Sequence, residues 1–144
     1  ALSLLDSGKA LETFRHMVTL QGGDVCVADD PGGLPQARYR AEILSPANGW
    51  VSSIACRQLG SASVLLGGGR ERKEDNIDHA VGIVLAKKLG SQVSSGEPLC
   101  LVYYNSESRL EVATELIKTS FAISPEPPRN LPPLVHKVLE AIQQ

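Results

Sequence analysis

The sequence is poor in aromatic residues and cysteine, and it contains no long apolar run. One Trp, three Tyr and two Phe among 144 residues leave few rings on which nucleic-acid bases could stack. The 14 Lys and Arg residues against 16 Asp and Glu residues give a formal net charge of −2, so no basic stripe is expected. No apolar stretch approaches the ~18 residues of a membrane span, and the first residues do not resemble a secretory signal. We expect neither a nucleic-acid partner nor a membrane.

The three cysteines, Cys26, Cys56 and Cys100, are widely spaced and form no CxxC or Cys/His pattern. An odd and sparse set indicates a reducing compartment rather than a disulfide framework. We therefore predict a cytoplasmic protein in which each cysteine serves as a small buried residue.

The chain is long enough for one domain that buries roughly 68–70% of the surface of the unfolded chain. A single helix is predicted over residues 1–23, with Asp6 or Ser7 as its N-cap and Gly22-Gly23 at its end. Its apolar stripe consists of Ala10, Leu11, Phe14, Met17 and Val18. A loop with two prolines follows over residues 29–36.

The middle of the chain is predicted to form short strands with one helix inserted among them. The predicted strands cover residues 40–45, 50–54, 79–86, 92–93 and 99–104, and the inserted helix covers 57–66. A further helix is predicted from Ser106, as its cap, to about Ser120. Residues 124–133 hold five prolines and are predicted to be an extended strap. A last helix is predicted from Pro133, with Leu134, Val135, Val138, Leu139 and Ile142 on one face. These elements indicate an α+β fold.

Two clusters invite a chemical interpretation. The run Gly67-Gly68-Gly69-Arg70 lacks the spacing of a phosphate-binding loop, and we interpret it as the stop of the helix before it. Asp75, Asp78 and His79 have no second His or Cys nearby to complete a metal site. The segment 70–78 is better explained as a solvated loop with local ion pairs and turn caps. His16 and His136 are expected at the surface. No catalytic, cofactor-binding or metal-binding residue is assigned.

The segments LSPANGWVSSI and VGIVLAKKLGSQVSSGEPLCLV resemble a biotinyl/lipoyl-type β-sandwich. Carrier domains of this type present a modified lysine at a β-turn, flanked by Met in biotin carriers or by Asp and Ala in lipoyl carriers. Here the only methionine is Met17, and Lys87-Lys88 lie in a different part of the pattern. A stand-alone binding or carrier module of this fold is the alternative interpretation.

A more specific resemblance extends over residues 2 to about 125. It rests on LDSGKALETFRHMVTLQGGD and on GGGRERKEDNIDHAVGIVLAKKLGSQVSSGEPLCLVYYN. These contain Ser-Gly-x-Ala and Gln-Gly-Gly, then Gly-x-Gly-Arg, Asp-x-Ile-Asp, Lys-x-Gly-x-x-Val and Gly-Glu-Pro-Leu, in that order. They closely resemble the C-terminal part of pyrimidine-nucleoside phosphorylases, which include thymidine phosphorylase.

This resemblance implies a sandwich with a helical insertion, of the α/β-hammerhead type, preceded by one helix and followed by C-terminal helices. It also implies a longer parent, with residues 1–24 belonging to an upstream α/β domain and residues 25–144 forming the C-terminal domain. Family members are pentosyltransferases that cleave thymidine or a related pyrimidine nucleoside with inorganic phosphate, and they need no further cofactor.

In the family, the groups that grip phosphate and base lie in upstream domains, so the resemblance implies an inactive scaffold here. Its partners would be the upstream domain and a second copy of the parent, which we expect to be a homodimer. The preference among thymidine, uridine and a nucleoside monophosphate stays open. We also expect weak self-association of this chain through Phe14 and Met17, because an uncovered apolar stripe attracts another.

Overall fold

The computed structural model describes residues 2–133 and 135–138. The chain divides into two compact units, Ala1–Ala37 and Arg38–Gln144. Within the described ranges, no helix is both long enough and apolar enough to cross a membrane.

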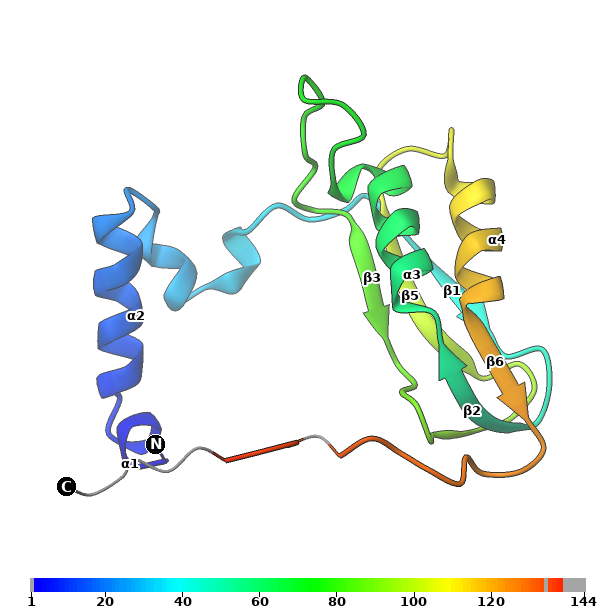
Figure 1. Ribbon diagram of the computed structural model, residues 1–144. Coiled ribbons are helices and arrows are strands. Elements are labelled where there is room, and N and C mark those ends of the chain that lie inside the picture. The colour runs from blue at the N-terminus through cyan, green and yellow to red at the C-terminus, as the bar shows by residue number, and fades with distance from the viewer. Residues whose placement is uncertain (1, 134, 139–144) are drawn as a thin grey trace. The chain divides into compact units, whose positions relative to one another are not determined.

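The first unit consists of short helices (Figure 1). These are α1 (Leu2–Asp6), α2 (Lys9–Leu20) and the 3-10 helices η1 (Val25–Ala28) and η2 (Pro31–Gly33). The prediction of one helix over residues 1–23 is wrong, because the backbone at Gly8 adopts a left-handed conformation with φ of 76° and separates α1 from α2. Gly8 is also the N-cap of α2, so the predicted caps Asp6 and Ser7 are wrong too.

The predicted end of this helical segment is confirmed. Gly22 has a φ of 74°, and the N–H of Gly23 donates to the carbonyl of Val18 over 2.9 Å. A left-handed glycine followed by such a bond is a common helix stop, because it satisfies a carbonyl that the helix leaves free.

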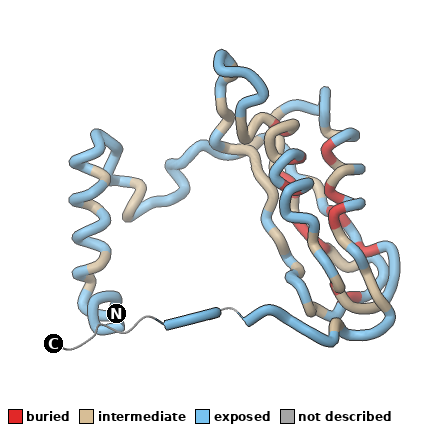
Figure 2. The backbone as a smooth tube through the Cα atoms, viewed as in Figure 1, coloured by how far each residue is buried: buried red, intermediate tan, exposed pale blue. Residues whose placement is uncertain are grey.

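The apolar stripe of α2 remains at the surface of its own unit. No residue of α2 is buried, and Leu11, Phe14 and Met17 are 42%, 43% and 46% exposed. Figure 2 shows no buried position in this part of the chain. An ion pair between Arg15 and Asp29 joins α2 to the segment after η1.

The second unit contains two antiparallel sheets of three strands each (Figure 1). In the first, the order is β1 (Tyr39–Leu44), β5 (Pro98–Tyr104) and β3 (Gly82–Leu85). In the second, it is β4 (Gln92–Val93), β2 (Gly49–Ile54) and β6 (Phe121–Ser124). Mixed α+β architecture is therefore confirmed.

Two helical segments pack against the β1-β5-β3 sheet. They are α3 (Cys56–Ser63), continued by the π-helical turn η3 (Val64–Gly68), and α4 (Leu110–Ser120). The apolar alternation of the strands and the helical period of α3 and α4 place one face of each element in a common core. Its buried members are Ile43, Leu59, Ala62, Leu66, Cys100, Val102, Ala113 and Ile117.

A second, smaller cluster lies beside the β4-β2-β6 sheet. Val51, Val93 and Leu99 are its buried members. Ile54 and Phe121 pack against both clusters, so the two cores are continuous through them. Figure 2 shows the buried positions concentrated on the strands and on the facing sides of α3 and α4.

Several predicted boundaries need correction. The helix predicted from Ser106 begins at Leu110, and its N-cap Arg109 makes no side-chain cap bond. The Ser106 hydroxyl lies 3.0 Å from that of Ser108 instead of capping the helix. The strand predicted from His79 begins only at Gly82.

The C-terminal predictions have a mixed outcome. The proline strap predicted over residues 124–133 is free of helix and strand from residue 125 onward, but Ser124 is the last residue of β6, a strand that the sequence did not predict. The last helix is wrong over 135–138, where Val135 and Val138 lie in irregular backbone. Leu134, Leu139 and Ile142 of that prediction lie outside the described residues.

Candidate functional site

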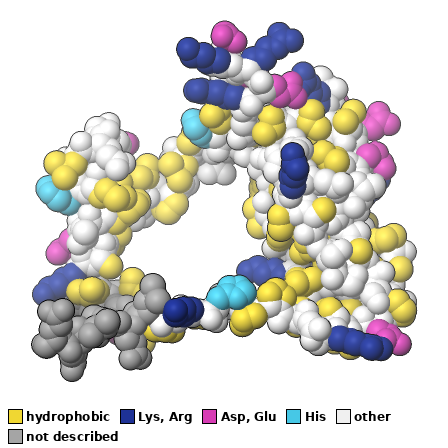
Figure 3. Space-filling model, viewed as in Figure 1, with side chains coloured by type: hydrophobic (Ala, Val, Ile, Leu, Met, Phe, Trp, Pro, Cys, Tyr) yellow, Lys and Arg dark blue, Asp and Glu magenta, His cyan; other side chains and the backbone are white. Residues whose placement is uncertain are grey.

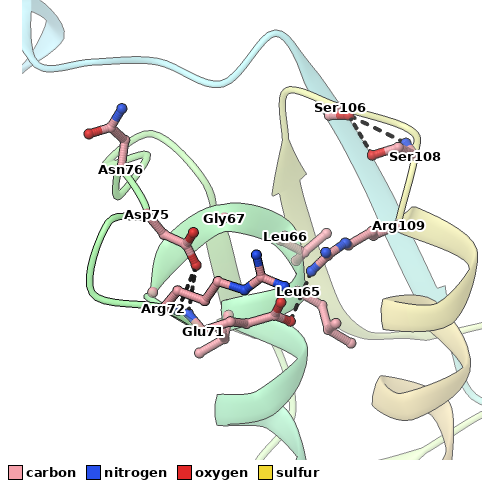
Figure 4. A pocket seen from close by; sticks show the side chains of 12 residues that line it. Leu65, Leu66, Gly67, Glu71, Arg72, Asp75, Asn76, Ser106, Ser108 and Arg109 are labelled. Atoms are coloured by element: carbon pink, nitrogen blue, oxygen red, sulfur yellow. Dashed lines mark hydrogen bonds and ion pairs between the residues drawn. The ribbon is translucent and has the colours of Figure 1, made fainter.

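A surface depression in the second unit, which we call the larger depression, has a volume of about 480 Å³. It lies where the π-helical turn, the loop after it and the segment between β5 and α4 come together (Figure 4). Its lining consists of Val64, Leu65, Leu66, Gly67, Gly69, Glu71, Arg72, Asp75, Asn76, Ser106, Ser108 and Arg109. The glycine run and one of the acidic residues singled out from the sequence therefore share one surface.

The glycines of this surface allow close packing of the chain on itself. Gly67 has a φ of 103°, and a Cβ on Gly68 or Gly69 would lie 2.8 Å from the Ser63 Oγ or 2.7 Å from the Val64 Cγ2. The prediction of a helix stop at this run is confirmed, since α3 and its π-helical turn end there. Close internal approach explains these glycines without a bound phosphate.

Asp75 organises the loop that borders the depression. Its carboxylate accepts hydrogen bonds from the backbone N–H groups of Glu71, at 3.0 Å, and Arg72, at 2.8 Å (Figure 4). The N–H of Asp75 in turn donates to the carbonyl of Arg72 over 3.1 Å. Carboxylates commonly close turns in this way, so Asp75 has the turn-capping role expected from the sequence.

Glu71 and Arg109 form an ion pair across the depression. The Arg109 guanidinium donates to the Glu71 carboxylate at 2.8 Å, and Figure 4 shows the two side chains reaching toward each other. Their side chains are 44% and 53% exposed, so water screens most of the attraction. The pair joins the loop to the start of α4, and neither charge is left to bind a ligand alone. The sequence did not predict this pair, because the two residues are 38 positions apart.

Asp78 connects three separate segments. Its carboxylate accepts from the Asn105 amide at 2.7 Å and from the N–H of Ala80 at 3.0 Å, while its own N–H donates to the carbonyl of Gly67 at 2.9 Å. The Asn105 amide oxygen accepts from the N–H of Arg38 over 2.7 Å. The bonds from Asn105 and Ala80 hold the pKa of the Asp78 carboxyl below its ordinary value. Asp78 thus has a structural role, because its hydrogen bonds hold these segments together.

The remaining histidines and acids do not converge. Among the described residues, no group of three or more His, Cys, Asp or Glu side chains could hold a metal ion. His79, next to Asp78, is exposed, as are His16 and His136. Figure 3 shows Lys and Arg side chains gathered with acidic ones on the loop after the π-helical turn, which is the mixed charge of a solvated loop.

The two lysines of the carrier interpretation lie in the turn after β3. Lys87 forms an ion pair with Glu97 at 2.5 Å, and its Nζ lies 3.4 Å from the carbonyl of Gln92. Lys87, together with the N–H of Ser94, lowers the pKa of the Glu97 carboxyl. Lys88 is exposed. The Lys87 ammonium group would therefore have to leave Glu97 and the Gln92 carbonyl before it could be modified.

The three cysteines are all free, but only one is buried. Burial raises the pKa of the Cys100 thiol to about 11, which makes it a poor nucleophile. Cys26 and Cys56 are exposed, so the prediction that each cysteine is buried is wrong for these two.

Comparison with known proteins places this arrangement in a family. The family model described as the pyrimidine nucleoside phosphorylase C-terminal domain matches residues 50–124, just over half of the chain. The chain belongs to this family.

Individual relatives align with more of the chain than the family model does. The pyrimidine-nucleoside phosphorylase of Bacillus subtilis is 42% identical over 136 residues, which are 94% of this chain and 31% of the relative. The enzyme of the same name from Geobacillus stearothermophilus is 45% identical over 112 residues, covering 78% of this chain and 26% of the relative. One from Staphylococcus aureus is 41% identical over 138 residues, covering 96% and 31%. The chain thus spans less than a third of the length of these relatives.

The region matched by the family model includes residues with a structural role in the loop beside the larger depression. The matched region contains the glycine run, Asp75 and Asp78. The glycine run ends the π-helical turn, Asp75 closes the turn of the loop that follows, and Asp78 connects that loop to Asn105. The depression they form is a neutralised surface in which carboxylates are paired with local donors.

Proposed function

We propose that this chain is the C-terminal, non-catalytic scaffold domain of a thymidine or pyrimidine-nucleoside phosphorylase. The parent would transfer the pentose of thymidine to inorganic phosphate, giving thymine and 2-deoxyribose 1-phosphate. The observation that carries this proposal is that nearly the whole chain aligns with less than a third of enzymes bearing that name.

The chemistry of the reaction supports the assignment of catalysis to the rest of the parent. Cleavage of an N-glycosidic bond develops negative charge on the base and positive charge on the sugar, so donors must meet the base while cations hold the phosphate. In the depression, Arg109 is paired with Glu71, and the Asp75 carboxylate is occupied by backbone donors. We therefore assign no substrate-binding residue to the described part of this chain and expect it to be inactive alone.

The finer fold assignment is a biotinyl/lipoyl-like sandwich of the α/β-hammerhead type. It is supported by two three-stranded sheets whose cores meet at Ile54 and Phe121, with α3 inserted between β2 and β3. The ion pair of Lys87 with Glu97 argues against a carrier modified at that lysine, whereas the exposed Lys88 is left to the mass measurement described below.

We further infer that residues 1–24 belong to the upstream α/β domain and residues 25–144 to the C-terminal domain. The exposed stripe of α2 supports this assignment, because a helix whose apolar face is uncovered within its own unit needs another surface to pack on. The parent is expected to act as a homodimer.

The test compares this chain with the same chain extended by its native upstream sequence. Phosphate-dependent release of thymine from thymidine is measured for both, and circular dichroism verifies that the short chain is folded. We expect turnover only from the extended chain. Turnover by the folded short chain, or none by the extended one, would contradict the proposal.

Intact mass spectrometry of the native protein tests the carrier alternative, since biotinyl or lipoyl groups on Lys87 or Lys88 would add a defined mass.

A further inference from the structure

A second depression in the same unit is apolar and carries no charge. It has a volume of about 310 Å³ and lies between α3 and β3, away from the loop described above. Cys56, Leu59, Gly60, Ser63, Ile83 and Leu85 line it. We refer to these six residues as the α3–β3 groove.

One wall of the α3–β3 groove is a free sheet edge. Figure 1 shows β3 at the end of its sheet, and within the described residues its only strand partner is β5. On the opposite face of the same strand, Val84 is 53% exposed. An open edge beside an apolar groove is a surface that proteins commonly cover with another segment.

Gly60 forms part of the other wall and has no internal reason to be glycine. It lies in the interior of α3, where glycine destabilises a helix relative to alanine. A Cβ built on Gly60 would meet nothing within 4 Å, whereas one on Gly68 would lie 2.8 Å from the Ser63 Oγ. Gly60 therefore leaves open space on the exposed side of α3, where another backbone could approach closely.

We propose that an apolar segment from the upstream part of the parent packs into the α3–β3 groove against Gly60. The inference rests on the proposed function. The Bacillus subtilis relative is about three times as long as the aligned region, and the family description places this domain at the C-terminal end. Most of such a parent therefore precedes this chain and must meet it somewhere. The absence of charged groups from the groove lining selects an apolar occupant.

Cys56 provides a direct reporter of occupancy, because it is exposed and lines the groove. The short and upstream-extended chains are treated with iodoacetamide, and the modification rate of each cysteine is measured by peptide mass spectrometry. We expect Cys56 to react at least tenfold more slowly in the extended chain. Cys100 is an internal reference that reacts in both chains only after denaturation. Equal rates at Cys56 would overturn the proposal, as would protection that depends on the concentration of the short chain, which would indicate a second copy in the groove.

A substitution in the groove sharpens the test. A Cβ at position 60 would meet nothing within 4 Å, so the short Gly60→Leu variant is expected to fold with its side chain in the groove, and circular dichroism verifies that it is folded. The ratio of Cys56 rates between short and extended chains is expected to fall to near one. Ser61→Leu, on an exposed neighbouring position outside the groove lining, is the matched control and should keep the protection. Retained protection in Gly60→Leu would overturn the role of the groove.

Thymine release by the same extended chain separates this inference from the proposed function. An extended chain that turns over thymidine while Cys56 reacts freely overturns the groove inference alone. An extended chain that protects Cys56 but releases no thymine overturns the proposed function alone. Failure of both measurements overturns both.

Discussion

The carboxylate of Asp78 and the side-chain amide of Asn105 lie 2.7 Å apart and join the loop before β3 to the end of β5. The other end of the amide accepts the N–H of Arg38, at the entry to β1. One asparagine side chain thus connects the segments next to β1, β5 and β3 at the same end of the sheet. The loop that borders the larger depression depends on this bridge, because the N–H of Asp78 also holds Gly67.

Replacement of Asn105 should therefore destabilise the second unit. Asn105→Ala removes a donor from a carboxylate and an acceptor from a backbone N–H, and hydrogen bonds to charged groups contribute about 1.5–3 kcal/mol. We expect a loss of about 1–2 kcal/mol in the free energy of unfolding, measured by urea denaturation. Asn76→Ala, at an exposed loop position, should change this free energy by less than about 0.5 kcal/mol. Additive effects of Asp78→Ala and Asn105→Ala in the double variant would contradict a direct coupling.

Acid should weaken the fold through Asp78 and Glu97. Their pKa values in the folded chain lie below the ordinary values of 3.8 and 4.5, so the unfolded chain binds more protons in this range. The stabilisation is complete above the ordinary values and is lost as the pH falls through the lowered ones. We expect the free energy of unfolding to decline from about pH 5 downward.

The Asp78→Asn variant isolates the contribution of that carboxyl. The urea concentration at the midpoint of unfolding should fall less between about pH 6 and about pH 3 in this variant than in the unsubstituted chain. Glu74→Gln makes the same charge change at an exposed position of the same loop and serves as control. An unchanged pH profile in Asp78→Asn would show that Asp78 does not titrate with folding.

Much of the second unit could be predicted because its sequence obeys the simple periods. β2 and β5 have compact apolar patterns, and the turns beside them carry Asn48-Gly49 or Gly96. α3 was predicted from a helical period that ends at the glycine run. In these segments the local preference and the tertiary core agree, which is why the pattern alone is sufficient.

The errors have specific physical causes. β6 follows α4 without any intervening turn residue, and only pairing with β2, about 70 positions away, makes Phe121–Ser124 a strand. The break at Gly8 was missed because the apolar stripe of α2 resumes directly after it. No pattern in the sequence indicates that Asn105 meets Asp78, since the contact depends on the register between β5 and β3.

Helix α4 provides a matched pair for testing the core. Ile117 is fully buried, whereas Val112 on the same helix is 60% exposed. Ile117→Ala leaves a cavity among closely packed side chains and should cost about 2–5 kcal/mol in the free energy of unfolding. Val112→Ala should change the free energy of unfolding by less than about 0.5 kcal/mol, because the Val112 side chain buries little apolar surface on folding. Equal effects in thermal or urea unfolding would contradict the assignment of the buried face.

The exposed stripe of α2 should cause weak self-association of the isolated chain. Phe14 and Met17 present apolar surface that a second copy can cover, and an aspartate in the stripe opposes that burial. Sedimentation velocity at increasing concentration should show a dimer that is lost in Phe14→Asp. Thr13→Asp introduces the same charge on a neighbouring exposed position and should leave the dimer in place. A strict monomer at every concentration would contradict this prediction.

Two glycines with nearly the same backbone test the contact between the proline strap and the turn after β3. Gly90 and Gly96 have φ of 83° and 81°, so alanine at either position should cost roughly 1–2 kcal/mol in the free energy of unfolding. Only at Gly90 would the added Cβ meet the strap, 2.8 Å from the Leu131 Cδ1. Because Leu131 is half exposed and can move aside, the two variants should have similar stability, while the strap around Leu131 becomes more susceptible to proteolysis in Gly90→Ala alone. Leu131→Ala should reproduce that susceptibility without the loss of stability. Equal cleavage of the strap in both glycine variants would show that Leu131 does not pack on Gly90.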